Sequence, residues 1–293
     1  MKEQFYRRDA IKRHPCFSES AHGKYGRIHL PVAPICNISC KYCDRRFDCV
    51  NESRPGVSSS ILTPKEALER TLIAVERQNI SVVGVAGPGD PLANESTFEF
   101  FRLVRKQIPE ITLCLSTNGL YLPEKLNILE ELGVLAVTVT VNSVSVSVAQ
   151  QIYSWIIYDG KLIKGKEAVE ILVKNQWMGM EELSKKGFYV KINSVFIPEV
   201  NDYELEKVAK RAQNLGVKAM NIIPLIPNGR MKNLKKPSCE QIDKIRKICG
   251  KYILQIKHCR QCRADAFGSL DDERDIELEM INTALSFEYC ELV

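Results

Sequence analysis

Short apolar runs rich in β-branched residues alternate along the chain with segments of helical periodicity. The clearest helix begins at Pro64, because Thr63 is a good N-cap, proline occupies the first helical position and Glu66 completes a capping box. An apolar stripe then continues at helical spacing. By the same criteria the predicted strands cover 27–35, 80–86, 111–116, 134–142, 188–196 and 217–224, and further helices begin near residues 96, 123, 167, 202 and 238.

Six strand–helix units in succession predict an α/β protein with a parallel sheet and right-handed crossovers. We therefore expect a partial (β/α)6 barrel of the TIM type. Chemistry in such barrels takes place at the carboxyl ends of the strands. Because no internal repeat or linker interrupts the pattern, the expected organisation is one barrel with terminal extensions.

Strand parity predicts which side chains face the barrel interior. In the third strand Thr112, Cys114 and Ser116 share one face, and two leucines share the other. The leucine face should pack against the helices, so the polar face should line the interior. The same parity places Lys191 and Asn193 inside on the fifth strand.

The composition is that of an ordinary globular protein, with 45% hydrophobic and 26% charged residues. The net charge of +5 gives no argument for nucleic acid. No apolar run reaches the roughly 18 residues of a membrane span, and the polar N-terminus does not resemble a signal peptide. We therefore expect a cytoplasmic monomer without membrane or nucleic-acid partners.

Eleven cysteines are unusual for the cytoplasm, where thiols stay reduced, and an odd number does not complete a disulfide framework. The strongest motif is CNISCKYC, which places Cys36, Cys40 and Cys43 in the loop after the first strand. A structural zinc site needs four ligands. Three thiolates on a [4Fe–4S] cluster instead leave one iron open, which can bind the amino and carboxylate groups of S-adenosylmethionine (SAM). The spacing therefore predicts a radical SAM cluster.

The turn AGPGDP, which follows the second strand, is the predicted contact for SAM. Glycine and proline there open a tight backbone whose carbonyl groups can face the SAM ammonium, although a plain strand-to-helix turn would have the same composition. Polar residues near the ends of the third and fifth strands are further candidates, with a polar barrel lining as the alternative. The complete set of candidate SAM contacts is Gly87, Pro88, Gly89, Asp90, Ser116, Asn118, Asn193 and Ser194.

Six residues outside the first motif are candidate metal ligands. The segment HCRQC contains a C-x2-C pair, which is found in halves of zinc ribbons and of cluster sites, and we favour a cluster. Two more cysteines lie in polar, turn-rich segments, another faces the barrel interior, and one histidine lies in the irregular segment AHGKYG. These residues are Cys259, Cys262, Cys16, Cys49, Cys114 and His22. Six ligands suffice for two additional [4Fe–4S] clusters with three protein ligands each.

Other notable residues have simpler interpretations. Cys239, Cys249 and Cys290 lack comparable surroundings and are interpreted as spare thiols. His29 lies on a strand and is interpreted as a lining residue. The basic run GRMKNLKK, which begins at Gly229, is interpreted as a solvated loop or as a docking patch for an acidic partner.

Nine stretches between His14 and Gly268 together resemble the NifB family of radical SAM enzymes, which mature the nitrogenase cofactor. They are HPCFSESAH, GRIHLPVAPICNISCKYC, DCVNESRPGV, AGPGDPLAN, LCLSTNGL, YSW, VKINSV, NIIPLIP and HCRQCRADAFG. The resemblance implies two precursor [4Fe–4S] clusters, K1 and K2, beside the SAM cluster. It also implies that they are fused with a carbide from a SAM methyl group and one added sulfur into an [8Fe–9S–C] core.

Carried over by motif, the resemblance assigns three ligands to each precursor cluster. The K1 ligands would be His22, Cys49 and Cys114, and the K2 ligands would be Cys16, Cys259 and Cys262. A neutral imidazole binds a soft iron–sulfur unit more weakly than a thiolate does. We therefore expect His22 to be a catalytic ligand that exchanges during cluster fusion.

The expected division is an N-terminal cluster-binding segment (1–26), a radical SAM barrel (27–255) and a C-terminal cluster-binding tail (256–293). Many relatives have a second histidine directly after the position of His22, where this chain has Gly23. Many bacterial relatives also carry a C-terminal carrier-like domain, whereas this sequence ends at Val293. The expected partners are therefore iron–sulfur cluster donors and separate cofactor carrier or scaffold proteins of nitrogenase assembly.

Two other functional classes stay open from the sequence. A radical SAM peptide-modifying enzyme with auxiliary clusters would share CNISCKYC and the cysteine-rich tail. It would also need a peptide-recognition region, and it would not be expected to combine HPCFS with DCVNESRPG. A non-catalytic metal-cluster scaffold would explain the cysteines but not AGPGDP together with inward-facing polar strands. Anaerobic metal analysis distinguishes these classes.

Overall fold

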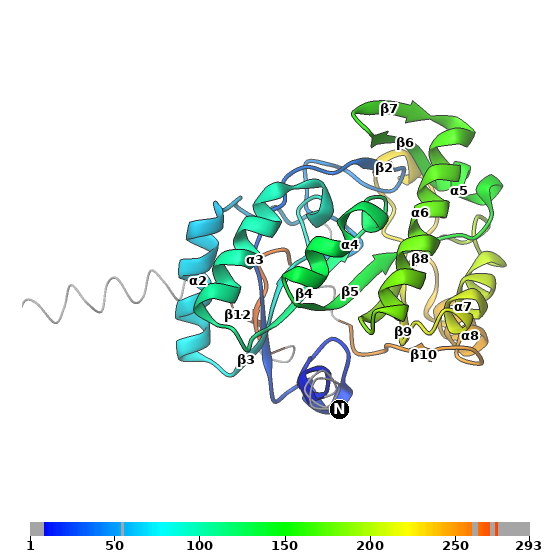
Figure 1. Cartoon of the computed structure of the whole chain (residues 1–293). Helices are drawn as coiled ribbons and strands as arrows, with labels where there is room; N and C mark the ends of the chain where they lie inside the picture. Colours follow the sequence, from blue (N-terminus) through cyan, green and yellow to red (C-terminus); the bar gives the residue numbers. More distant parts are fainter. Residues whose placement is uncertain (1–8, 54–55, 260–262, 270–272, 275–293) are drawn as a thin grey trace, which may run out of the picture.

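The computed structural model describes residues 9–53, 56–259, 263–269 and 273–274, and its centre is a parallel sheet (Figure 1). Six strands form this centre: β1 (Gly26–His29), β3 (Ile80–Val85), β4 (Thr112–Thr117), β5 (Val134–Thr140), β8 (Tyr189–Phe196) and β9 (Ala219–Pro224). Each pairs in parallel with its neighbour in the order β9-β8-β5-β4-β3-β1. The predicted α/β barrel architecture is confirmed. The first strand is shorter than predicted because Pro31 and Pro34 lack the N–H that a central strand needs.

Helices pack on the outer face of this sheet (Figure 1). They are α2 (Pro64–Arg77), α3 (Glu95–Gln107), α4 (Leu122–Glu131), α5 (Val146–Ile152), α6 (Gly165–Lys185), α7 (Glu204–Asn214) and α8 (Cys239–Cys249). The predicted capping box of Thr63 and Glu66 is present at the start of α2. Ser238 and Gln241 form a second capping box at α8. No helix in the described ranges is long and apolar enough to cross a membrane.

The parity predicted for the third strand is confirmed by β4. Leu113 and Leu115 belong to the main apolar core between the sheet and the helices. Cys114 instead lies in a separate small cluster with Val82 and Ala136, which are contributed by the adjacent strands. The interior face of the sheet is therefore free to carry polar and thiol side chains.

The sequence pattern does not predict a second, three-stranded sheet, which has the order β2-β6-β7. Its strands are β2 (Ile38–Cys40), β6 (Tyr153–Tyr158) and β7 (Lys161–Lys164). A turn at Asp159 and Gly160, both with positive φ, joins β6 to β7, as an Asp-Gly hairpin turn requires. β2 lies inside CNISCKYC and pairs antiparallel with β6. The hairpin therefore holds the backbone that carries the first cysteines (Figure 1).

The C-terminal tail joins the two edges of the parallel sheet. β10 (Leu254–Gln255) pairs in parallel with β9 at one edge. β11 (Phe267–Gly268) pairs antiparallel with β1 at the other edge, and β12 (Glu273–Arg274) pairs with β11. The chain between β10 and β11 therefore connects opposite edges of the partial barrel. It carries Cys259, whereas Cys262 lies outside the described residues.

Candidate active site

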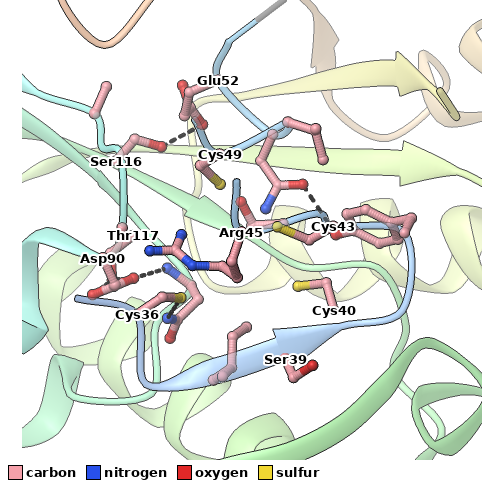
Figure 2. Close-up of a pocket in the computed structure, with 18 residues that line it drawn as sticks. Cys36, Ser39, Cys40, Cys43, Arg45, Cys49, Glu52, Asp90, Ser116 and Thr117 are labelled. Carbon is pink, nitrogen blue, oxygen red and sulfur yellow. Dashed lines mark hydrogen bonds between the residues drawn. The ribbon is translucent and has the colours of Figure 1, made fainter. Parts of the chain in front are cut away.

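The three cysteines of CNISCKYC line one pocket at the carboxyl ends of the strands (Figure 2). Cys36, Cys40 and Cys43 face about 580 Å³ of space that protein atoms do not fill, part of it open to solvent. Cys49 lines the same pocket, together with the AGPGDP turn and the end of β4. The thiols, the turn and the strand end thus form a single site.

Backbone and arginine contacts fix the loop that carries these cysteines. The N–H of Lys41 donates to the carbonyl oxygen of Ile152 (2.8 Å). The guanidinium of Arg45 donates to the carbonyl oxygens of Pro34 (2.8 Å) and Pro88 (3.0 Å). Arg45 therefore ties the cysteine loop both to the segment before it and to the AGPGDP turn.

Tyr42 anchors the same loop from within the barrel. Its side chain is buried, and its hydroxyl donates to Oδ1 of Asn51 (3.0 Å) and accepts from Nδ2 of Asn142 (2.8 Å). Nδ2 of Asn142 also donates to the hydroxyl of Tyr153 (3.0 Å). This buried network connects CNISCKYC, DCVNESRPG and the end of β5, three segments that are far apart in the sequence.

The AGPGDP turn packs directly on the cysteine loop. The N–H of Gly89 donates to the carbonyl oxygen of Ala33 (2.6 Å), and the N–H of Asp90 donates to that of Ile35 (2.8 Å). A Cβ placed on Gly89 would lie 2.2 Å from the carbonyl oxygen of Ile35. Glycine is therefore required for this close approach of two backbones.

The carboxylate of Asp90 holds the end of β4 against the pocket. It accepts hydrogen bonds from Oγ1 of Thr117 (2.8 Å) and from the N–H of Asn118 (2.6 Å). Burial raises the pKa of Asp90 to about 6, although these hydrogen bonds act in the opposite direction. Nδ2 of Asn118 in turn donates to Oδ1 of Asn37 (2.7 Å), the residue after the first cysteine. Asp90 thus positions polar groups that face the thiols.

The thiols have the chemistry expected of cluster ligands. Burial raises the pKa of Cys36 to about 12, and it also raises the pKa values of Cys40 and Cys43. Such thiols lose their protons when a metal binds them. A [4Fe–4S] cluster takes one thiolate per iron, so its ligands surround a volume. Within the described residues, no three candidate side chains converge closely enough to hold a single ion. Three thiols around one pocket, of residues that are buried (Cys40) or half-buried (Cys36 and Cys43), fit a cluster.

A second pocket, of about 330 Å³ including open solvent, is lined by two further cysteines. These are Cys16 and Cys114, and burial raises the pKa of both thiols. His14 and His29 also line this pocket. Burial lowers the pKa of His29 to about 3, so its imidazole is neutral at physiological pH. The second pocket therefore offers soft thiol donors beside a neutral imidazole.

The two pockets share a wall that contains Glu52, Ala86 and Ser116. The carboxylate of Glu52 accepts hydrogen bonds from the hydroxyl of Ser116, as Figure 2 shows, and from Nδ2 of Asn193 (2.7 Å). Burial raises the pKa of Glu52. Glu52 is not among the residues predicted from the sequence. Its position three residues after the candidate ligand Cys49 is the one feature of the sequence that points to it. Because they share this wall, the two pockets are adjacent.

Lys191 brings a positive charge into the second pocket. It is 6% exposed, and its Nζ lies 5.2 Å from the ring centroid of Phe17. Burial by itself lowers the pKa of Lys191, but the electrostatic effects of Cys16, Cys259, Glu52 and Cys114 together outweigh burial and raise it. Inward strand parity places Lys191 correctly, but it does not reveal the thiols around the ammonium group.

The structure brings some predicted ligands together and separates others. Cys114 lies with Cys16 in the second pocket, whereas Cys49, which the resemblance groups with Cys114, lines the first. The rings of His22 and His258 are 5.2 Å apart in an edge contact. The division of ligands between two precursor clusters stays a prediction.

Only some of the candidate SAM contacts line the first pocket. Those that line the first pocket are Gly89, Asp90, Ser116 and Asn118. Gly87 and Pro88 shape the turn, and Asn193 reaches the shared wall through its bond to Glu52. Ser194 is fully buried on the opposite face of β8, and its hydroxyl donates to the carbonyl oxygen of Val141. The structure therefore gives Ser194 a backbone-supporting position away from both pockets.

Of the three cysteines interpreted as spare thiols, two line neither pocket. Cys249 is buried, and its thiol donates to the carbonyl oxygen of Leu205 (3.4 Å). Cys239 is exposed at the start of α8. Cys290 lies outside the described residues.

A family model and several known proteins match this chain over most of its length. The family model described as the radical SAM superfamily matches residues 30–212. The FeMo cofactor biosynthesis protein NifB of Klebsiella pneumoniae is 46% identical, over 91% of this chain and 58% of its own length. The protein of the same name from Methanocaldococcus infernus is 45% identical, over 90% of this chain and 87% of its own length. The chain thus spans little more than half of the Klebsiella relative and most of the archaeal one.

Solved structures agree with the fold. A radical SAM methyltransferase from Sphaerobacter thermophilus superposes with a TM-score of 0.56 at 17% identity, covering 79% of this chain and 64% of its own. Streptococcus suis SuiB bound to S-adenosylmethionine gives a TM-score of 0.55 at 12% identity, covering 76% of this chain and 48% of its own. These likenesses concern the fold alone. From the family model and the sequence relatives, the chain belongs to the radical SAM superfamily and, within it, to the NifB family.

Proposed function

We propose that this chain acts in FeMo cofactor biosynthesis by fusing two [4Fe–4S] substrate clusters around a carbide that derives from a SAM methyl group. One added sulfur completes the [8Fe–9S–C] product. The names of the sequence relatives support the biosynthetic role, and the fusion chemistry follows from the motif resemblance. The observation that carries the proposal is the wall of Glu52, Ala86 and Ser116, shared by the pocket of the CNISCKYC thiols and a second thiol-lined pocket.

We assign the resident [4Fe–4S] cluster to Cys36, Cys40 and Cys43, because their thiols line one pocket. When bound, this cluster supplies the electron that cleaves SAM into methionine and a 5′-deoxyadenosyl radical. The residues of the chain position the reactants. Arg45 and the AGPGDP turn hold the cysteine loop, and Asp90 orients the end of β4.

The second pocket suits a substrate cluster. The thiolates of Cys16 and Cys114 are soft ligands that favour iron–sulfur units, and Lys191 offsets the negative charge that thiolates bring into a buried site. Because burial raises the thiol pKa values, cluster binding releases protons from this pocket. Iron–sulfur cluster donors and cofactor carrier or scaffold proteins are the proposed partners.

The test is anaerobic reconstitution with SAM and dithionite, followed by transfer of any product to cofactor-free nitrogenase. Loaded protein should hold about twelve irons if three cubane clusters are present. Replacing Cys36, Cys40 and Cys43 together by alanine should remove about a third of the iron and abolish 5′-deoxyadenosine formation. The matched control Cys239→Ala should change neither. Iron that stays near ~4 per chain, or loaded protein that yields no transferable cofactor, would reject the proposal.

A further inference from the structure

The basic loop, residues 229–236, packs directly on the cysteine loop. It begins with the turn η3 (Gly229–Met231). The N–H of Arg230 donates to the carbonyl oxygen of Lys41 (2.7 Å). A Cβ placed on Gly229 would lie 2.6 Å from the carbonyl oxygen of Cys43. The backbone of the basic loop therefore touches the backbone of a predicted cluster ligand.

All charged residues of this loop are basic, and no acidic side chain among the described residues pairs with them. Residues 229–236 contain four basic residues and no acidic one, in a chain whose whole excess of basic residues is five. Arg230, Lys232, Lys235 and Lys236 are all exposed. None of them forms an ion pair with another residue in the described part of the chain. The loop therefore presents a concentrated positive potential to solvent.

An exposed apolar side chain lies among these cations. Leu234 is 37% exposed, whereas Met231 is buried and anchors the loop to the core. An apolar residue surrounded by charged ones resembles a protein interface, in which an apolar centre is surrounded by a polar rim. The loop therefore has features of a docking surface that an ordinary solvated loop does not need.

Three cations of the cysteine loop itself, Lys41, Arg45 and Arg46, have partners within the protein. Arg46 is paired with Asp44 (2.5 Å), and Arg45 donates to the carbonyl oxygens of Pro34 and Pro88. Lys41 donates to the carbonyl oxygen of Gln150 (2.9 Å). Of these three cations only Arg46 is neutralised by a carboxylate, whereas the four cations of the basic loop have no acidic partner among the described residues.

We propose that residues 229–236 form the docking surface for an acidic one-electron carrier protein, with a flavin or iron–sulfur centre, that reduces the cluster held by Cys36, Cys40 and Cys43. This proposal rests on the proposed function only in that SAM cleavage consumes an electron. In the transfer the carrier loses one electron and the cluster gains it. Complementary charge steers such an encounter and raises its rate. The basic loop contacts the backbone of Cys43, so a protein docked there would lie beside the cluster ligands. This position favours an electron donor, because a product acceptor would need access to the second pocket.

The experiment compares two reductants on loaded protein. In the variant Lys232→Glu, Lys235→Glu, Lys236→Glu, 5′-deoxyadenosine formation is driven either by dithionite or by a reduced, negatively charged flavodoxin. We expect the flavodoxin-driven rate at low salt to fall about tenfold or more, while the dithionite-driven rate stays within about twofold. Raising the ionic strength should slow the wild type with flavodoxin and leave the variant nearly unchanged.

The matched control carries the same charge change at the opposite end of the sheet, in the variant Lys106→Glu, Lys210→Glu, Lys218→Glu. These lysines are also exposed, and the control should retain the flavodoxin-driven rate. A milder variant, with glutamine at 232, 235 and 236, removes the charges without reversing them and so guards against a folding defect. It should show an intermediate loss of the flavodoxin-driven rate. Flavodoxin binding by loaded protein without SAM, measured as a Kd, should weaken in parallel.

The outcomes separate docking from the proposed function. Equal losses in the two glutamate variants, or an unchanged Kd, would overturn the docking surface even if cofactor is produced normally. A wild type that binds flavodoxin through this loop but yields no transferable cofactor would leave the docking surface standing and reject the fusion chemistry. Tighter binding of a short duplex DNA than of flavodoxin would overturn the proposal in favour of nucleic acid.

Discussion

The side-chain amide of Asn94 pairs with both backbone polar groups of Ile35, the residue before Cys36. The N–H of Ile35 donates to Oδ1 of Asn94 (3.1 Å), and Nδ2 of Asn94 donates to the carbonyl oxygen of Ile35 (2.8 Å). Nδ2 also donates to the carbonyl oxygen of Asp90 (2.8 Å). One amide therefore substitutes for a strand pairing and sets the start of the cysteine loop.

Asn94→Ala should loosen this start of the loop. It leaves the part-buried N–H of Ile35 without its partner and removes one of the two hydrogen bonds to the carbonyl oxygen of Ile35, which should lower the free energy of unfolding by about 2 kcal/mol. The visible absorption of the loaded cluster should also bleach faster under a chelator. Asn79→Ala removes a single exposed bond to the carbonyl oxygen of Lys24 and should cost well under half as much. Equal cluster retention in the two variants would contradict this role of Asn94.

Gly89→Ala should separate the AGPGDP turn from the cysteine loop. The added Cβ would meet the backbone carbonyl of Ile35 at 2.2 Å, so one of the two backbones must move. We expect a loss of about 3 kcal/mol in unfolding free energy and little SAM cleavage. Gly216→Ala is the control, because its Cβ meets nothing within 4 Å and only the φ of +76° costs about 1 kcal/mol. Similar losses at both sites would show that close approach is not the cause.

The double variant Cys259→Ala, Cys262→Ala tests where the SAM methyl group is received. Carbide insertion requires a methyl transfer, which gives S-adenosylhomocysteine, and a hydrogen abstraction, which gives 5′-deoxyadenosine. If the methyl acceptor is a sulfide of the cluster held by this pair, S-adenosylhomocysteine formation should be lost. Chromatography of the quenched reaction measures both products. Robust S-adenosylhomocysteine formation by the double variant would rule out the assignment.

His22→Ala and His22→Cys should both retain the SAM cluster and 5′-deoxyadenosine formation, yet both should fail to yield transferable cofactor. An imidazole can leave iron more readily than a thiolate, so the cysteine variant should hold iron well and stall before fusion. Iron analysis and transfer to cofactor-free nitrogenase measure the two effects. A normal yield of cofactor from His22→Ala would eliminate the ligand role.

Glu204 predicts a pH dependence of stability. Burial alone would raise its pKa, but hydrogen bonds from Lys207, Ser145 and Val144 hold it at about 2. A carboxylate whose pKa is lowered on folding stabilises the fold above its unfolded pKa of about 4.3, and this contribution is lost as the pH falls towards 2. In urea unfolding of cluster-free protein, Glu204→Gln should cost about 2 kcal/mol at pH 7.

The cost of Glu204→Gln should shrink below pH ~4, because wild-type Glu204 then becomes protonated. The exposed Glu99 provides the control, and Glu99→Gln should change stability by less than about 0.5 kcal/mol at every pH. A constant cost of Glu204→Gln down to pH ~2 would show that packing, and not the carboxylate charge, is responsible.

Periodicity predicts the six strand–helix units and the starts of the helices because each unit is long enough to show its own repeat. The short strand β2 has three residues, so it leaves no periodic trace, and its pairing with β6 depends on a distant insertion. The Asp159–Gly160 turn was a readable hairpin signal. Cysteine spacing predicts the three CNISCKYC ligands. It does not place Cys49 in their pocket or Glu52 in the shared wall, because both depend on how loops fold over the barrel mouth.

The pairings of β10 and β11 are each two residues long, yet they attach the segment with Cys259 to opposite edges of the sheet. Breaking either one removes only a few backbone hydrogen bonds, so local unfolding there costs far less than opening the six-stranded centre. Either pairing can therefore open locally while the other pairing and the six-stranded centre stay intact.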